Sequence, residues 1–367
     1  MTEAGTNTHG GNIYTASQKY GIKKEDFIDY SANINPLGIP EVLKESIVSN
    51  IDALTNYPDP DCSELKMDIS LYLNIDIDAI IIGNGAAEII FLLFDELRPR
   101  KVLIPEPTFC EYEMAARRSG ADVFYFELKE EEDFKLNINK LQGMMEGIDV
   151  IMLCNPNNPT STLTSKDDLL QVLRFAQENG IKVIIDETFI ELTIGANYNS
   201  MASYLNQFDN LFIIRALTKI FAIPGLRVGY GLGSPQLIKR LWKKKLPWSV
   251  NSFSCMAGCL FRDSEGYLNK TANWLSEEMC NFYNELALID EFKVFKPNTN
   301  FVLLKILNEV INSKELRESM AFKGALIRDA SNFRYLDDRF VRVAIKDREN
   351  NDRFLRVLHE VLDYRNR

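Results

Sequence analysis

Short apolar segments alternate with longer helical patterns between residues 79 and 215, and this alternation restricts the fold more than any other feature of the chain. Six segments rich in Val, Ile and Leu occupy residues 79–83, 101–105, 122–126, 149–154, 182–186 and 211–215. Helical periodicity fills several of the intervals, at residues 86–97, 109–119 and 166–179. Strands that alternate with helices form a mostly parallel sheet covered by helices on both faces. The pattern therefore predicts an α/β fold.

The pattern changes after about residue 251. Long helical stretches with fewer strands follow, and an amphipathic segment occupies residues 348–364. A chain of 367 residues is long enough for two domains. We expect a large domain at residues 46–255 and a smaller α+β C-terminal domain at residues 256–367, with the N-terminal segment, residues 1–45, packed against the small domain.

Charge and hydropathy exclude some classes of partner. A net charge of -10 disfavours generic nucleic-acid binding, which requires an excess of Lys and Arg. The basic cluster KRLWKKK at residues 239–245 is typical of an exposed helix face, the alternative being an electropositive rim that attracts an anionic substrate. No run approaches the ~20 apolar residues of a membrane span, and the chain does not open on a signal peptide pattern. We therefore expect no membrane partner and a cytoplasmic location.

Cysteine and histidine usage argues against a metal site. The six cysteines form no CxxC pair and the chain has only two histidines, so a structural zinc site is not expected. Several cysteines lie in apolar runs, such as SCMAGCL at residues 254–260. This placement predicts reduced thiols in the core.

Lys219 lies in an unusual context for a lysine. The apolar run at residues 211–214 leads into Thr218-Lys219, and Ile220, Phe221 and Ile223 follow. Apolar surroundings disfavour the charged form of an amine, and the free amine is the form that attacks carbonyl groups. The alternative is a lysine that lies along a loop edge with its ammonium group in water.

The other predicted strands also end in polar residues. GNGAAE at residues 83–88 combines a glycine turn with a helix start, where backbone N–H groups bind anions, although an ordinary turn would look the same. NPNNPT at residues 155–160 fixes side-chain amides in a rigid loop. Asp186 ends a wholly apolar strand and must be paired or protonated, unless it caps a helix. Since the carboxyl ends of parallel strands collect ligands, these residues predict one site.

Taken together, these motifs resemble a known family. GNGAAE, NPNNPT, the Asp186-Glu187 pair and Thr218-Lys219 followed by Arg227 are similar to the fold-type I pyridoxal phosphate enzymes of the histidinol-phosphate aminotransferase branch, over nearly the whole chain. Three further segments are similar to the threonine-phosphate decarboxylase group of cobalamin biosynthesis within that branch. They are HGGN at residues 9–12, YSANINPLG at residues 30–38 and PWSVN at residues 247–251.

The resemblance implies pyridoxal 5'-phosphate as cofactor and a role for each residue around it. Lys219 would form the Schiff base with the cofactor aldehyde, and Asp186 would pair with the pyridinium nitrogen. Asn158 would hydrogen-bond the ring 3-oxygen, and Phe109 would stack on the ring. The cofactor phosphate would be bound by Thr218, Arg227 and the backbone of Gly85, Ala86 and Ala87.

The resemblance also implies partners for the active site. Tyr57 is similar to a tyrosine that reaches the cofactor phosphate of the neighbouring subunit, so a homodimer is expected. Arg342 would bind the substrate carboxylate, and Arg328 is the candidate for the phosphate of a phosphorylated small amino acid. His9 and Asn33 would complete the substrate pocket.

The implied reaction is the decarboxylation of L-threonine O-3-phosphate to (R)-1-amino-2-propanol O-phosphate for the nucleotide loop of a cobamide. L-Serine O-phosphate is an alternative substrate, because one methyl group contributes only ~1–3 kcal/mol of discrimination. The two rival functions are a histidinol-phosphate or aromatic aminotransferase and a cofactor-binding protein without turnover. The sequence departs from the family at Ala86-Ala87, where a hydroxyl is frequent, at Phe189 in place of a tyrosine, and at Ser161 in place of a glycine.

Overall fold

A seven-stranded sheet forms the centre of the larger part of the molecule in the computed structural model, which describes residues 10–307 and 309–365. The strand order is β2-β8-β7-β6-β5-β3-β4, and only β8 runs antiparallel to its neighbours. The strands are β2 (Ile80–Gly83), β3 (Lys101–Glu106), β4 (Asp122–Glu127), β5 (Val150–Cys154), β6 (Lys182–Asp186), β7 (Leu211–Ala216) and β8 (Gly229–Leu232). The predicted α/β fold with a mostly parallel sheet is confirmed.

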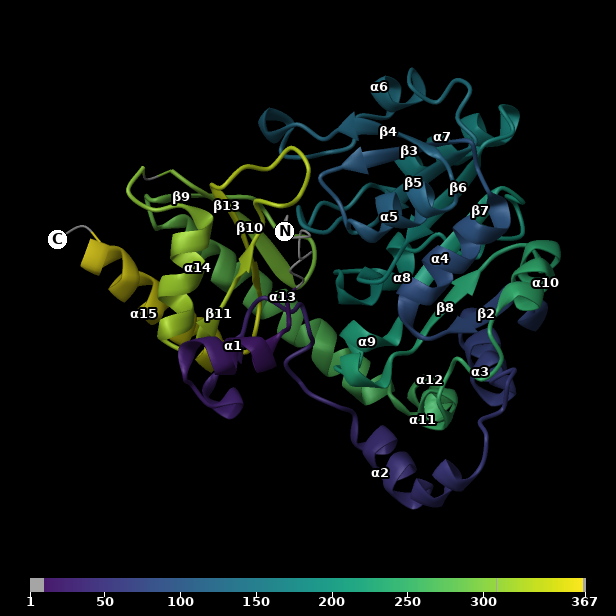
Figure 1. The fold of residues 1–367 in the computed structure, drawn as a ribbon, viewed down its shortest axis with the longest axis horizontal. Coiled ribbons are helices and arrows are strands. Elements are labelled where there is room, and N and C mark those ends of the chain that lie inside the picture. Colours follow the sequence, from purple (N-terminus) through teal and green to yellow (C-terminus); the bar gives the residue numbers. More distant parts are fainter. Residues whose placement is uncertain (1–9, 308, 366–367) are drawn as a thin grey trace, which may run out of the picture.

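Helices cover both faces of this sheet (Figure 1). A core of buried residues joins one face to α4 (Gly85–Leu97), α5 (Glu111–Arg118) and α10 (Pro235–Lys244). A second and larger core lies on the opposite face and continues into the smaller part of the molecule. The helices that contribute to it include α2 (Glu41–Ser49), α3 (Ser63–Leu73), α6 (Ile138–Gln142) and α7 (Lys166–Glu178). The strands between these layers are buried on both faces, which explains their continuous apolar sequence.

A second, antiparallel sheet has the order β12-β13-β10-β9 and forms the smaller part of the molecule. Its strands are β9 (Phe292–Val294), β10 (Phe301–Ile306), β12 (Arg328–Asp329) and β13 (Phe340–Ala344). The long helix α13 (Glu265–Ala287) precedes it, and α14 (Ser313–Phe322) and α15 (Arg348–Arg365) pack with it (Figure 1). Near the N-terminus, β1 (Ile28–Asp29) pairs with β11 (Ala325–Leu326), and α1 (Ile13–Tyr20) contacts α14. The domain boundaries stay a prediction.

Short helices complete the connections between these elements. They are α8 (Ala196–Asn199), α9 (Leu217–Ile220), α11 (Ser252–Cys255) and α12 (Cys259–Asp263). Among the described residues, no helix combines the length and the hydrophobicity that a membrane span needs. The basic cluster forms part of α10, where Arg240 and Lys244 pair with Glu96, in agreement with an exposed helix face.

The expectation of reduced thiols fails for one pair of cysteines. Cys62, at the start of α3, forms a disulfide with Cys255, at the end of α11. The two positions are 193 residues apart in sequence, so their proximity depends on the tertiary fold alone. The remaining four cysteines are free thiols; Cys259 is buried as expected, whereas Cys280 is exposed.

Candidate active site

A cavity of about 570 Å3 opens between the carboxyl ends of the large sheet and the small antiparallel sheet. This volume is typical of a pocket for a small ligand. The predicted site residues that line it are Asn33, Ala86, Ala87, Phe109, Asn158, Asp186, Thr218, Lys219, Arg227, Arg328 and Arg342. Residues that are far apart in the sequence, and that belong to both sheets, thus meet around one space.

Lys219 belongs to the cavity lining and lies in the single turn of α9 directly after β7. Burial, followed by the positive charges of Arg342 and Arg227, lowers the pKa of the Lys219 amine to about 8. At neutral pH the fraction of Lys219 present as the free amine is therefore far larger than that of an exposed lysine. This is the property that a lysine nucleophile requires.

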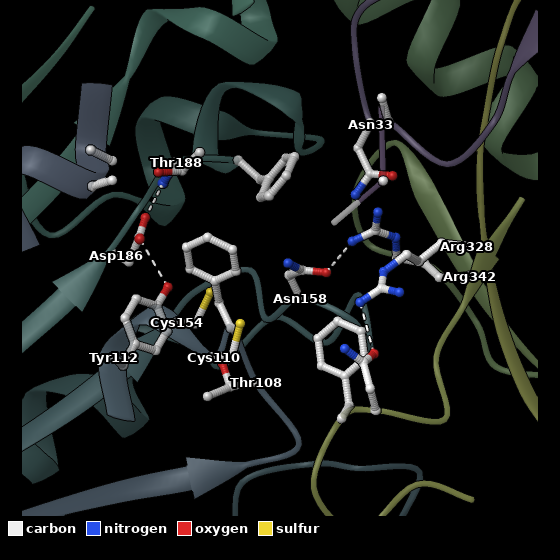
Figure 2. A pocket seen from close by; sticks show the side chains of 18 of the residues that line it. Asn33, Thr108, Cys110, Tyr112, Cys154, Asn158, Asp186, Thr188, Arg328 and Arg342 are labelled. Atoms are coloured by element: carbon white, nitrogen blue, oxygen red, sulfur yellow. Dashed lines mark hydrogen bonds between the residues drawn. The ribbon is translucent and has the colours of Figure 1, made fainter. Parts of the chain in front are cut away.

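Asp186 occupies one end of the cavity, at the last residue of β6 (Figure 2). Its carboxylate accepts hydrogen bonds from the Tyr112 hydroxyl at 2.8 Å and from the Thr188 backbone N–H at 2.8 Å. Burial raises the pKa of Asp186, although these hydrogen bonds oppose the shift. Both donors are neutral, so they do not balance the negative charge of the buried carboxylate. A cationic atom of a ligand would therefore bind favourably beside it.

The N-terminus of α4 and Arg227 form a cradle for an anion. Gly85 opens the helix with a φ of +77°, and a Cβ atom at this position would lie 2.5 Å from Nη2 of Arg227. The positive φ favours glycine here, and the missing side chain lets the guanidinium group approach the backbone closely. Gly229 plays a similar part, since its Cβ would lie 2.7 Å from the Ala86 nitrogen. Backbone N–H groups and a guanidinium group in this arrangement suit a phosphate.

Asn158 lies between the two ends of the cavity (Figure 2). Its side-chain oxygen accepts a hydrogen bond from Nη1 of Arg342, while Nη2 of Arg342 donates to the Ser31 carbonyl at 2.6 Å. These bonds fix the direction of the Arg342 guanidinium group. Nε of Arg342 and the side-chain oxygen of Asn33 are both buried without a partner among the described residues. Buried polar atoms without partners indicate a ligand-binding site.

Arg328 and Arg342 lie directly opposite each other on β12 and β13 (Figure 2). Both are buried, and within residues 10–307 and 309–365 neither forms a salt bridge with a carboxylate. Burial, followed by the charge of Arg328, lowers the pKa of Arg342. Two buried guanidinium groups on paired residues repel each other, and a bound anion would relieve the repulsion. This end of the cavity therefore suits a substrate with more than one anionic group.

Three predicted residues lie outside this lining. Gly85 is not part of it but contacts Arg227, through the close approach that its missing side chain allows. Tyr57 is 80% exposed and packs against Trp248, with ring centroids 4.8 Å apart, away from the cavity of its own chain. His9 lies outside the described residues.

Sequence reasoning missed several residues of the site. Tyr112, the partner of Asp186, could have been found from its spacing, because it lies one helical turn after Phe109. The Ser31 carbonyl carries no signal in the sequence, since every residue has one. Glu106, a buried carboxyl group of the cavity lining, was also missed, although a charged residue at the end of an apolar strand is the same signal that identified Asp186.

Comparisons with known proteins identify the family. The model for aminotransferase class I and II matches residues 25–358, and the chain therefore belongs to this family. It is 42% identical over 344 residues to a protein of Caldanaerobacter subterraneus subsp. tengcongensis that is provisionally named threonine-phosphate decarboxylase, covering 94% of this chain and 90% of that protein. It is 33% identical over 355 residues to the threonine-phosphate decarboxylase of Salmonella typhimurium, covering 96% of each chain.

A solved structure extends the comparison. The crystal structure of the histidinol-phosphate aminotransferase from Clostridium acetobutylicum has a TM-score of 0.85 and 37% sequence identity. The match covers 91% of this chain and 99% of that one. The chain is thus similar both to proteins named as decarboxylases and to one named as an aminotransferase. The residues of the site must therefore decide between the two reactions.

The family depends on pyridoxal phosphate, and the residues of this chain fit that group. An aldehyde needs an amine with a lowered pKa, which Lys219 offers. A pyridinium nitrogen needs a buried carboxylate, which Asp186 offers, and among the described residues Asp186 forms no ion pair with Lys or Arg. A phosphate is bound well by a helix N-terminus together with a cation, and α4 and Arg227 offer both. The two come close together at Gly85, which has no Cβ to separate them.

Proposed function

We propose that this chain decarboxylates L-threonine O-3-phosphate, releasing carbon dioxide and (R)-1-amino-2-propanol O-phosphate for the nucleotide loop of a cobamide. The observation that carries the proposal is the pair of buried guanidinium groups on Arg328 and Arg342, opposite the Asp186 end of the cavity. A phosphorylated amino acid has two anionic groups for this pair. The names of the Caldanaerobacter and Salmonella relatives support the same reaction.

The residues at the large sheet would hold the cofactor. In this proposal Lys219 binds the aldehyde, Asp186 the ring nitrogen, Asn158 the 3-oxygen and Phe109 the ring face. The phosphate would be bound by Thr218, Arg227 and the backbone N–H groups of Gly85, Ala86 and Ala87. When bound, pyridoxal phosphate supplies an electron-withdrawing ring that accepts the electrons of a bond broken at the substrate Cα.

The small sheet would orient the substrate. Arg342 binds the carboxylate and Arg328 the phosphate, while the amide nitrogen of Asn33 donates to one of the anionic groups; His9 stays a predicted member of this pocket. Holding both anionic ends fixes which bond at Cα is broken, because rotation about the chain is then prevented. Binding energy from the distant phosphate is thereby used to orient the reacting bond.

The net reaction needs no oxidant or reductant. The bond between Cα and the carboxylate carbon breaks, carbon dioxide leaves, and the electron pair that stays at Cα takes up a proton. Lys219 is the candidate proton donor, because its amine has a pKa of about 8 and therefore both holds and releases a proton near neutral pH. L-Serine O-phosphate would undergo the same reaction.

The rival function is aminotransfer, which the Clostridium structure favours through its name. An aminotransferase converts its cofactor to the pyridoxamine form when glutamate alone is added. We expect glutamate to leave the absorbance spectrum of the holoenzyme unchanged and threonine phosphate to release carbon dioxide. Formation of the pyridoxamine form with glutamate at a rate comparable to turnover would favour the rival.

The proposal includes a homodimer in which Tyr57 contributes to the partner's cofactor phosphate site. Support comes from the 80% exposure of Tyr57 beside Trp248, which is 50% exposed, because large aromatic side chains in contact on a surface are typical of interfaces. Sedimentation should give a dimer, and Tyr57→Ala should weaken cofactor binding. A monomer with full activity would contradict this part. The cytoplasmic location stays a prediction from the sequence.

A further inference from the structure

The loop between β12 and β13, residues 330–339, crosses the mouth of the cavity. Six consecutive residues of it, 331–336, belong to the cavity lining. Figure 1 shows this loop reaching from the small sheet toward the ends of β3 and β4 in the large sheet. A segment in this position limits the length of any ligand that extends from Lys219 toward the small sheet.

Arg334 attaches the loop to the large sheet. Its Nη2 donates to a Glu113 carboxylate oxygen of α5 at 2.8 Å and to the Tyr125 hydroxyl of β4 at 3.1 Å. The guanidinium carbon also lies 3.8 Å from the centroid of the Tyr125 ring. Isolated surface ion pairs contribute little, but a guanidinium group that pairs, hydrogen-bonds and stacks at once is held firmly.

The carboxylate in this contact stays charged. Burial alone would raise the pKa of Glu113, but hydrogen bonds from Tyr125, Arg334 and Arg117 lower it to about 2. The contact between Arg334 and Glu113 therefore persists over the whole physiological pH range. Arg117 donates to the other oxygen of Glu113 at 2.7 Å and to the Tyr125 hydroxyl at 2.9 Å, but it lies on α5 itself and does not line the cavity.

The same loop sets the direction of Arg328. Nη2 of Arg328 donates to the Asn332 side-chain oxygen at 2.7 Å, and Nη1 donates to the Asp329 carbonyl at 2.8 Å. The centroid of the Phe333 ring lies 5.3 Å from the guanidinium carbon. Movement of the loop would therefore move the guanidinium group proposed to bind the substrate phosphate.

We propose that Arg334 is a positioning residue that determines substrate specificity. This inference rests on the proposed function. By attaching the loop to Glu113 and Tyr125, it holds Asn332 and Phe333, and with them the guanidinium group of Arg328, at a set distance from the large sheet. A fixed distance favours phosphorylated amino acids with a short chain. A longer phosphorylated amine, such as histidinol phosphate, needs the phosphate-binding arginine to move outward, which the attachment opposes.

The test compares Arg334→Ala with the matched control Arg117→Ala, which removes hydrogen bonds to the same two partners, Glu113 and Tyr125, but leaves the contacts of the loop in place. Affinities of the holoenzyme for threonine phosphate and histidinol phosphate are measured from the cofactor absorbance. We expect Arg334→Ala to weaken threonine phosphate binding by about fivefold, to leave histidinol phosphate binding unchanged or stronger, and to speed amide hydrogen exchange of residues 331–336. Arg117→Ala should change neither affinity by more than about twofold.

The remaining outcomes each have a definite meaning. Equal weakening of both compounds in the two variants would overturn the proposal, because it would indicate loss of stability rather than of length selection. A wild-type preference for histidinol phosphate would overturn it as well. Binding of threonine phosphate without release of carbon dioxide would sink the proposed reaction but leave the length selection supported if the variants differ as expected.

Discussion

The two ends of the cavity differ in charge and in the way that the fold builds them. At one end, parallel strands of the large sheet present a buried carboxylate, Asp186, that is held by neutral donors. At the other end, two antiparallel strands of the small sheet present Arg328 and Arg342, which no described carboxylate neutralises. In the proposed function this difference assigns the cofactor to the large sheet and the choice of substrate to the small sheet.

The most disruptive change at the cofactor end is Lys219→Ala. It removes the amine that we propose to react with the cofactor aldehyde, so we expect turnover to fall by about four orders of magnitude or more. Borohydride reduction followed by mass spectrometry should detect a cofactor adduct in the wild type and none in the variant. Lys239→Ala, which changes an exposed lysine of α10, is the control. Normal turnover in Lys219→Ala would refute the assignment of this lysine.

A smaller effect is expected when the substrate end is changed. Arg342→Gln keeps hydrogen-bond donors but removes the charge, and should lower kcat/KM on the order of 10- to 100-fold. Cofactor affinity should change much less, because the cofactor groups lie at the large sheet. Fluorescence titration of the apoenzyme with pyridoxal phosphate measures that affinity. An equal loss of cofactor and substrate binding would remove the functional distinction between the two ends.

Glu106→Gln is expected to have the smallest effect on catalysis. Its main effect should be on the pH dependence of the free energy of unfolding. Burial raises the pKa of Glu106 to about 7 from its ordinary 4.5. The folded state then binds the proton more tightly than the unfolded state, so the stabilisation is complete below pH 4.5 and is lost as the pH rises through about 7. The variant lacks this loss and should be the more stable protein above pH 7, by on the order of 2–3 kcal/mol.

Urea unfolding at pH 5.5 and pH 8.5 measures this difference. The control is Glu127→Gln, which changes the exposed carboxylate beside Glu106 on β4. A gain for Glu106→Gln that is the same at both pH values would show that the Glu106 carboxyl group does not titrate in this range.

The contrast between the two ends also explains what could be predicted from the sequence. Strands β2, β5, β6 and β7 are largely buried on both faces and therefore appear as apolar runs, and Asp186 at the end of β6 marks the site. The edge strand β4 is partly exposed. Strand β8 was not among the six predicted segments, and its sequence, GYGL, carries no mark of its antiparallel direction. The pairing of Cys62 with Cys255 depends on packing between α3 and α11, which spacing does not encode.

The substrate end was less accessible to prediction. Arg328 and Arg342 were expected as anion-binding residues only through the family resemblance. Their positions opposite each other depend on the register of β12 with β13. Their anchors are a backbone carbonyl, at Ser31, and a loop amide, at Asn332. Neither kind of group has a sequence pattern, so only the fold reveals them.

Incubation of the holoenzyme with threonine phosphate in D2O tests the central proposal most directly. We expect one carbon dioxide and one aminopropanol phosphate for each substrate consumed, with a single deuterium at the carbon that carried the carboxylate, as read by NMR. Consumption of the substrate with accumulation of a keto acid, or no carbon dioxide from either threonine phosphate or serine phosphate, would contradict it.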